Sequence, residues 1–215
     1  MDPAEFARLA RLYDLETYLL EAVAPRFAAN HTLDSYDFFA IVIWKSNRTK
    51  TKIKQGLAAA GLSVETLMRS VSQADGPSAK VEALLRIHGI GLPMASAILA
   101  ICYPGEFTVL DYRAWNSLQE LDVPELPAKP PHNVPTYLQY CQMCRDLAEK
   151  LGLSLRDLDR ALWARNWEKD LVGLIEDGAA LPPPDADEPG LFVPGAVGTG
   201  AVPGGAVQVE TELVP

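Results

Sequence analysis

The feature that most constrains this chain is a pair of glycines set between two apolar helical runs. Residues 78–87 carry apolar side chains at helical spacing, and Gly89 and Gly91 interrupt that run. Glycines so close together permit a positive φ and a tight turn. Pro93 suits the first turn of a new helix, because its missing N–H costs nothing there. We therefore predict a helix, a tight hairpin and a second helix over residues 93–101.

This hairpin offers a place for an anion. The backbone amides around Gly91, Leu92 and Met94 would lie at the N-terminus of the second helix, where N–H groups lack partners within the helix. The anion that fits an exposed hairpin of this kind is a backbone phosphate. His88 lies at the hairpin tip, and it either touches a phosphate or is simply exposed to solvent.

The rest of the chain repeats helix signals. Residues 4–23 carry apolar side chains at helical spacing, and Asp34, Ser63 and Asp111 each precede a helical run as an N-cap residue. Further helices are expected over 35–44, 136–151 and 155–175. Three more are expected: one that ends before Gly61, one that begins after Ser63, and one that runs from the Asp111 cap through Leu121. No segment before residue 190 alternates in polarity as a strand would. The sequence thus predicts an all-α body.

Composition sets the domain limits and the compartment. Fourteen of the 38 residues from Gly178 onward are Gly or Pro, a composition that cannot bury a core, so we expect residues 178–215 to be a disordered acidic tail. All 19 Lys and Arg residues precede the tail. No apolar run approaches 18 residues, and we expect neither a membrane span nor a signal peptide. Three cysteines argue against a disulfide framework and fit a reducing cytoplasm.

A cluster of cations follows the apolar helix over 35–44. Five basic residues fall within residues 45–54, and no acidic residue lies between Asp37 and Glu65. One interpretation is an edge that contacts phosphates. The other is a solvated loop and helix face, which is what most charge runs are. The formal net charge of −9 opposes strong nonspecific binding to nucleic acid.

The hairpin and a later aspartate carry a family resemblance. Ile87-His-Gly-Ile-Gly-Leu-Pro-Met-Ala95 followed by Val109-Leu-Asp111 resembles the DNA glycosylases of the helix-hairpin-helix-Gly/Pro-Asp superfamily, especially small uncharacterised members with an Asp-x-Arg-Ala motif, here at 111–114. Two positions depart from the family pattern. His88 stands where the family usually has proline, and Pro93 stands where the bifunctional members carry their Schiff-base lysine.

The resemblance implies a fold and a reaction. It implies two helical lobes within 1–177, with residues 31–108 forming the hairpin lobe and residues 1–30 joining 109–177 in the other. It implies that Asp111 stabilises an oxocarbenium ion during hydrolysis of an N-glycosidic bond; alternatively, Asp111 is a plain helix N-cap. Because Pro93 has no amine to offer, we expect a monofunctional enzyme without lyase activity. Lys45 could supply the missing amine in place of residue 93, although the sequence gives no reason to expect it.

The expected partner is double-stranded DNA, with a damaged base turned out of the helix. The residues expected to contact DNA are His88, Gly89, Ile90, Gly91, Leu92, Met94, Lys45, Arg48, Lys50, Lys52 and Arg113. We expect a monomer in the cytoplasm, associated with the nucleoid if it binds DNA. The competing hypothesis is a catalytically silent protein that keeps the hairpin to bind DNA or another partner.

No cofactor or metal is expected. Cys141 and Cys144 have the spacing of a metal pair, and some relatives hold an iron–sulfur cluster with four cysteines, but this chain has only three. We interpret the two as core residues on one helix face. His31 and His132 form no ligand pattern with each other.

Overall fold

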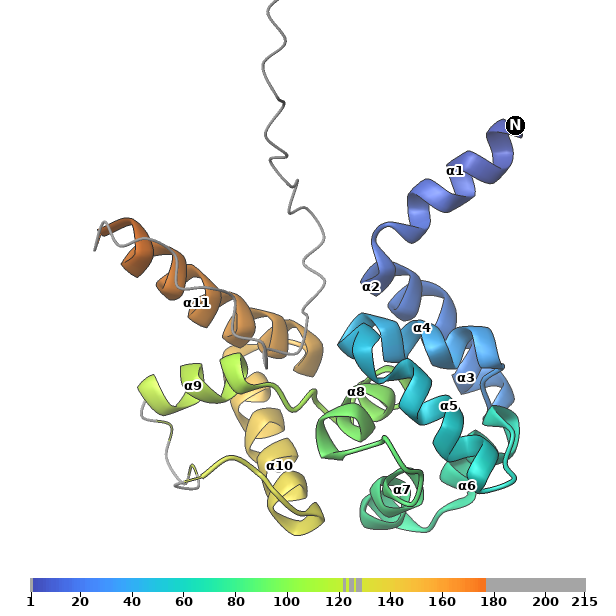
Figure 1. The fold of residues 1–215 in the computed structure, drawn as a ribbon. Helices are drawn as coiled ribbons and strands as arrows, with labels where there is room; N and C mark the ends of the chain where they lie inside the picture. The colour runs from blue at the N-terminus through green and yellow to red at the C-terminus, as the bar shows by residue number, and fades with distance from the viewer. Residues whose placement is uncertain (1, 122, 124–125, 127–128, 177–215) are drawn as a thin grey trace, which may run out of the picture.

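The computed structural model describes residues 2–121, 123, 126 and 129–176, and the predicted tail over 178–215 lies outside them. The described part is helical and contains no strand, which confirms the all-α prediction (Figure 1). The elements are α1 (Pro3–Leu12), α2 (Leu15–Tyr18), the π-helical turn η1 (Leu19–Val23), α3 (Ala24–Asn30), α4 (Ser35–Ser46), the 3-10 turn η2 (Asn47–Thr49), α5 (Lys50–Ala59), α6 (Val64–Gln73), α7 (Gly76–Leu85), α8 (Leu92–Cys102), α9 (Tyr112–Glu120), α10 (Val134–Leu151) and α11 (Leu155–Glu176).

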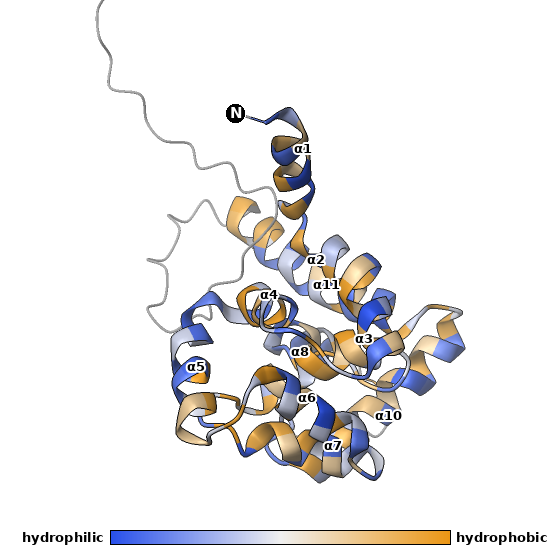
Figure 2. Ribbon diagram, turned by 90° about the vertical axis from the view of Figure 1, so that its right-hand side faces the viewer, coloured by the Kyte–Doolittle hydropathy of each residue, from blue (hydrophilic) through white to orange (hydrophobic). Residues whose placement is uncertain are grey.

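The core is built around α8. Every residue from Met94 to Cys102 is buried, as expected for a helix that is apolar on all sides. It packs against α4, α7, α3 and η1, and Figure 2 shows it in the interior of the helical body.

None of the described helices has the length and hydrophobicity needed to cross a bilayer.

The N-terminal region differs from the expected single helix over 4–23. The chain breaks before α2, where the Asp14 side chain accepts the Thr17 N–H and so starts a new helix. No residue of α1 is buried, and α1 extends away from the body in Figures 1 and 2. The apolar residues that follow, Leu19, Val23 and Phe27, are fully buried.

These N-terminal helices contact both the hairpin helices and α11, so the expected grouping of residues 1–30 with 109–177 stays a prediction. Both η1 and α3 pack on α8, and η1 also packs on α4. The Phe27 ring meets the Tyr103 ring edge-on, with 5.2 Å between the centroids. Burial of these aromatic and aliphatic side chains therefore holds residues 15–30 beside the hairpin helices, and they reach α11 through ion pairs.

The C-terminal helices form the other side of the molecule. α9 packs along α11, and α10 packs against α11 and α7. Trp115, Tyr140, Cys141 and Cys144 are buried here, which confirms the interpretation of the two cysteines as core residues. Burial raises the pKa of the Cys141 thiol, so the thiol form is favoured. The segment over 103–111 links this group to α8 (Figure 1).

Candidate functional site

The predicted hairpin connects α7 to α8 through residues 86–91. Only Gly89 of its two glycines has a positive φ, +96°, whereas Gly91 has an ordinary φ of −91°. A Cβ on Gly89 would lie 2.9 Å from the backbone of both Lys52 and Ile53. We expected both glycines to be needed for a positive φ, but only Gly89 adopts one. The hairpin tip lies directly against α5.

The same contact is seen from α5. Gly56 is buried, and a Cβ there would lie 2.0 Å from the carbonyl oxygen of His88. No side chain larger than hydrogen fits between these two backbones. The structure therefore brings the exposed His88 next to the helix that carries Lys50, Lys52 and Lys54, all of them exposed.

The N-terminus of α8 is less open than the sequence suggested. The Met94 amide, which we expected to be available to an anion, donates to the carbonyl oxygen of Gly91 at 3.0 Å. Met94 itself is buried, as is Ile90, whereas Gly91 and Pro93 are exposed. No side chain of the described residues caps this helix.

Asp111 lies where α9 begins and acts as its N-cap, as predicted. Its Oδ1 accepts the backbone N–H of Arg113 at 3.0 Å, and the side chain is only 7% exposed. Two hydrogen bonds fix the segment before it. The Leu110 N–H donates to the buried Ser96 Oγ at 2.8 Å, and the Tyr137 hydroxyl donates to the Thr108 carbonyl at 2.8 Å. The carboxylate is therefore held by the core on both flanks.

The second oxygen of Asp111 has an unexpected partner. Lys45 Nζ, from the last turn of α4, donates to Asp111 Oδ2 at 2.8 Å. The Lys45 side chain is 12% exposed, so its ammonium lies beside a buried carboxylate. This differs from the expected role of Lys45 in phosphate contact, because the side chain turns inward at the end of an apolar helix to a carboxylate that needs a counter-charge.

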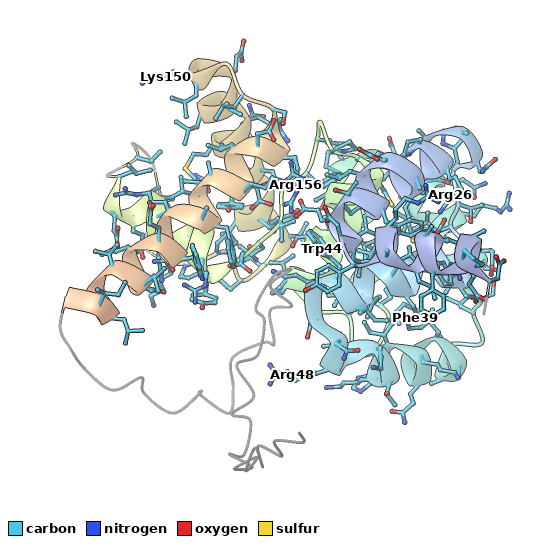
Figure 3. All side chains as sticks on the ribbon, turned by 90° about the horizontal axis from the view of Figure 1, so that it is seen from above. Arg26, Phe39, Trp44, Arg48, Lys150 and Arg156 are labelled. Carbon is cyan, nitrogen blue, oxygen red and sulfur yellow. The ribbon has the colours of Figure 1, made fainter. Side chains whose placement is uncertain are left out.

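Further charges surround this pair. Arg156 of α11 forms ion pairs with Glu16 of α2 and with the buried Asp159, and its guanidinium lies 5.0 Å from the centre of the Trp44 ring. Figure 3 shows Trp44 and Arg156 where α4 approaches α11. We call the set of Glu16, Lys45, Asp111, Arg156 and Asp159 the Asp111 cluster.

Asp159 has the most unusual carboxyl group of the cluster. Burial raises the pKa of Asp159 to about 6, while the charges of Arg156 and Lys45 act to lower it and those of Asp111 and Glu16 act to raise it. Its neighbours include both members of the Lys45–Asp111 pair. A carboxyl that is partly protonated near neutral pH therefore lies close to one that is ion-paired.

The Arg113 side chain packs against α11 and does not extend into solvent. Its guanidinium donates to Asn166 at 3.3 Å and pairs with Asp170, and it lies 5.8 Å from the centre of the Trp163 ring. The side chain is 15% exposed. Arg113 therefore joins α9 to α11, and its expected contact with DNA stays a prediction.

Sequence reasoning missed Ser96, which holds the residue before Asp111, and it missed three members of the Asp111 cluster: Glu16, Arg156 and Asp159. Each lies on a different helix or far along the chain, so no short motif links them. No local signal marks Asp159, because Asp157 and Arg160 beside it in the sequence are charged as well.

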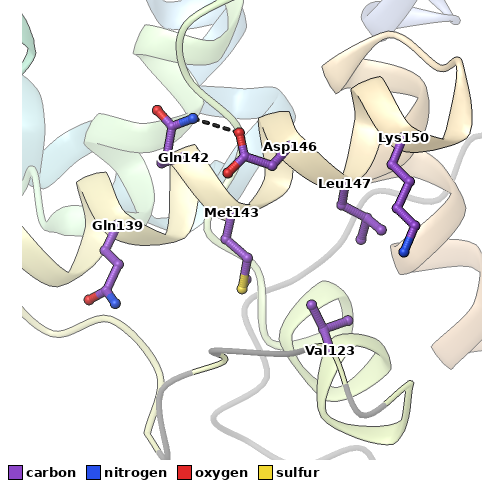
Figure 4. A pocket seen from close by; sticks show the side chains of 7 residues that line it. All are labelled: Val123, Gln139, Gln142, Met143, Asp146, Leu147 and Lys150. Carbon is purple, nitrogen blue, oxygen red and sulfur yellow. Dashed lines mark hydrogen bonds between the residues drawn. The ribbon is translucent and has the colours of Figure 1, made fainter.

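A separate pocket of about 280 Å³ lies on the outer face of α10 (Figure 4). It is lined by Val123, Gln139, Gln142, Met143, Asp146, Leu147 and Lys150. It shares no residue with the Asp111 cluster. Among the described residues, no three His, Cys, Asp or Glu side chains are placed to hold a metal ion together.

Comparisons with known proteins give no relative. The glycosylase resemblance therefore stays a prediction from the hairpin and Asp111. No protein-family model matches the chain, and neither a curated protein nor a solved structure matches it.

Proposed function

We propose that this protein binds duplex DNA and hydrolyses the N-glycosidic bond of a damaged base, with Asp111 stabilising the oxocarbenium ion. One observation carries the proposal most directly. Asp111 is a buried, ion-paired carboxylate that follows the two hairpin helices, α7 and α8, by a short linker. A carboxylate of this kind is what the cleavage of a bond to C1′ requires, because positive charge develops on the sugar.

The contacts of Asp111 support this role physically. Its two oxygens are held by the Arg113 N–H and by Lys45, so two elements fix the position of the carboxylate. Burial lowers the local dielectric constant, which strengthens the attraction between the carboxylate and a developing positive charge.

The surface that would meet DNA is formed by the hairpin tip and α5. Gly56 and Gly89 bring these two elements into backbone contact, so the hairpin and the exposed Lys50 and Lys52 can touch the same phosphate backbone. Arg48 is exposed at the end of the same basic stretch, and it extends from the ribbon in Figure 3. Lys150 lies on the opposite side of the molecule in that view.

The test is incubation with a panel of duplexes, each carrying one damaged base, followed by alkali to cut at any site that has lost its base. We expect at least one lesion to be excised. Binding should weaken as salt rises, and the Lys50→Ala/Lys52→Ala variant should reduce the salt slope by about one unit for each phosphate that it no longer neutralises. Lys150→Ala is the matched control and should leave the slope unchanged. Absence of salt-sensitive DNA affinity in the wild-type protein would rule out the proposal.

A second candidate is a silent binding protein that uses the hairpin without catalysis. The observation in its favour is that both oxygens of Asp111 already have partners within the protein. In that case DNA binding would be salt-sensitive, but no lesion in the panel would be excised, and Asp111 would serve as a helix cap and a counter-charge only.

A further inference from the structure

Ser96 is a polar residue within the apolar helix α8. Its side chain is fully buried, and the residues on either side of it, Ala95 and Ala97, are buried as well. Burying a hydroxyl group costs free energy unless the group finds hydrogen-bond partners in the core. The partners of Ser96 connect α8 to the segment that carries Asp111.

The Ser96 hydroxyl makes one local and one distant hydrogen bond. It donates to the carbonyl oxygen of Pro93 at 2.7 Å, and it accepts the N–H of Leu110 at 2.8 Å. A hydroxyl has a single proton, so its use by Pro93 leaves the oxygen lone pairs for Leu110. The first bond stays within the first turns of α8, whereas the second spans 14 residues and reaches the residue directly before Asp111.

The segment before Asp111 is held from two sides. The Tyr137 hydroxyl of α10 donates to the Thr108 carbonyl oxygen at 2.8 Å, and Ser96 of α8 holds the Leu110 N–H. Of these two bonds, the one from Ser96 relates the carboxylate to the hairpin, because α8 is the second hairpin helix. The position of Asp111 relative to the hairpin therefore depends on Ser96.

We propose that Ser96 is a positioning residue, which sets the place of the Asp111 carboxylate relative to DNA held by the hairpin. This inference rests on the proposed function, because it assigns a further residue to the same site. Ser96 acts through the Leu110 backbone. A misplacement of about 1 Å at a reacting centre can cost roughly a hundredfold in rate. Loss of the Ser96 bond should therefore slow the bound complex and leave the DNA-binding surface intact.

The test compares the full-length wild-type protein with Ser96→Ala on the lesion duplex that the wild-type protein cuts. We expect kcat to fall about a hundredfold with little change in KM, the pattern of an interaction needed in the transition state. Affinity for an undamaged duplex of the same sequence should be unchanged. Ser96→Thr keeps the hydroxyl and should restore most of kcat.

Ser70→Ala is the matched control. The Ser70 hydroxyl donates to the Leu67 carbonyl oxygen at 2.7 Å, three residues back in α6, which is the same local bond that Ser96 makes to Pro93. Among the described residues, Ser70 has no bond to a distant segment like that of Ser96 to Leu110. Its replacement should leave both kcat and KM unchanged.

Hydrogen exchange gives a readout that needs no activity. The Leu110 amide is buried and bonded in the wild-type protein, so it should exchange slowly, and Ser96→Ala should speed its exchange at least about tenfold. Ser96→Cys is the second variant, to be used if Ser96→Ala does not fold. It keeps nearly the same side-chain shape but offers only a weak acceptor, so it should show the same changes in smaller degree.

The outcomes separate the two proposals. A folded Ser96→Ala or Ser96→Cys protein that excises at the wild-type rate would overturn the role of Ser96 and leave the proposed glycosylase intact. Unchanged exchange at Leu110, or an equal loss of kcat in Ser70→Ala, would overturn it in the same way. A wild-type protein that excises no lesion would overturn the proposed function, and the role of Ser96 with it.

Discussion

At the scale of single residues, Asp111 serves two elements with two different oxygens. Oδ1 satisfies an N–H at the start of α9, and Oδ2 neutralises Lys45 from α4. A cap needs only an oxygen that accepts, whereas the pairing with Lys45 needs a charge. Substitution by asparagine keeps the first and removes the second, and this separates the structural role from the chemical one.

Asp111→Asn tests that separation. We expect unfolding free energy to fall by about 1–3 kcal/mol, because Lys45 keeps only a neutral acceptor. Excision should fall about a thousandfold, which corresponds to ~4 kcal/mol of lost transition-state stabilisation. Both are measured on the same preparation, by chemical denaturation and by base release well below the melting temperature.

The matched control is Asp34→Asn. Asp34 caps α4 by accepting the Asp37 N–H, and it is exposed and outside the Asp111 cluster. The Asp34→Asn variant should leave both the unfolding free energy and the rate of excision nearly unchanged, since asparagine caps about as well as aspartate. If Asp111→Asn retained full excision, Asp111 would have no part in catalysis.

Asp159 gives a pH dependence with a definite sign. Its folded-state pKa is raised from 3.8 to about 6, so the folded protein binds more protons than the unfolded chain between these values. The resulting stabilisation is complete below pH 4 and is lost as pH rises to 6, by on the order of 3 kcal/mol for two pKa units. The stability difference between the wild-type protein and Asp159→Asn should therefore shift in favour of the variant over that range. A difference independent of pH would contradict the raised pKa.

At the scale of helices and turns, the hairpin contains one glycine that cannot be replaced and one that can. Gly89→Ala forces a side chain into a left-handed conformation and against the backbone of α5, so we expect a loss of at least ~1–2 kcal/mol in unfolding free energy. Gly91→Ala is the control, because its φ is ordinary and the nearest atom, Pro93 Cδ, would be 3.9 Å away. Thermal denaturation of both variants should show a lowered midpoint for Gly89→Ala alone. Equal effects would show that the contact with α5 does not constrain the tip.

Local signals explain why most elements could be predicted from sequence. Asp34, Ser63 and Asp111 cap helices by bonds that span two or three residues, so the pattern and its consequence lie together in the chain. The break at Asp14 was missed because the apolar spacing continues across it. The hairpin was found, but its packing on α5 was not, since the contact of Gly56 with His88 spans the intervening α6 and α7.

The site was only partly predictable for the same reason. Asp111 follows a motif that can be read directly, but its partner Lys45 is 66 residues away and lies within a run of exposed cations. Which lysine of that run turns inward depends on where α4 ends against α11. Pairing of distant charges is set by tertiary packing, and a single sequence carries no direct record of it.

At the scale of the whole molecule, ion pairs connect the N-terminal helices to α11. Glu16 Oε1 accepts from Arg156 Nε at 2.9 Å and from Arg160 Nε at 2.9 Å. Glu16 is 22% exposed, and Arg156 also contacts Asp159 within the Asp111 cluster. The charge network therefore runs from α2 through α11 towards the site.

Glu16→Gln tests whether this connection contributes to stability. We expect unfolding free energy to fall by about 1 kcal/mol, because two arginines lose a shared counter-charge in a partly buried position. Glu5→Gln is the control. Its pair with Arg8 is 4.0 Å apart and more than half exposed on both sides, so its loss should have no measurable effect. Urea denaturation of the two variants measures the difference, and equal midpoints would mean that the network adds nothing.

The backbone contact between Gly56 and His88 has a thermodynamic consequence for association. The hairpin tip and α5 are in close backbone contact, so under the proposed function the two surfaces that meet the phosphates would already be held together before DNA arrives. Their ordering entropy is lost on folding and need not be lost again on binding. Association with a phosphate backbone would then proceed as the docking of one rigid body, without coupled folding and with the small heat-capacity change expected when little apolar surface is newly buried.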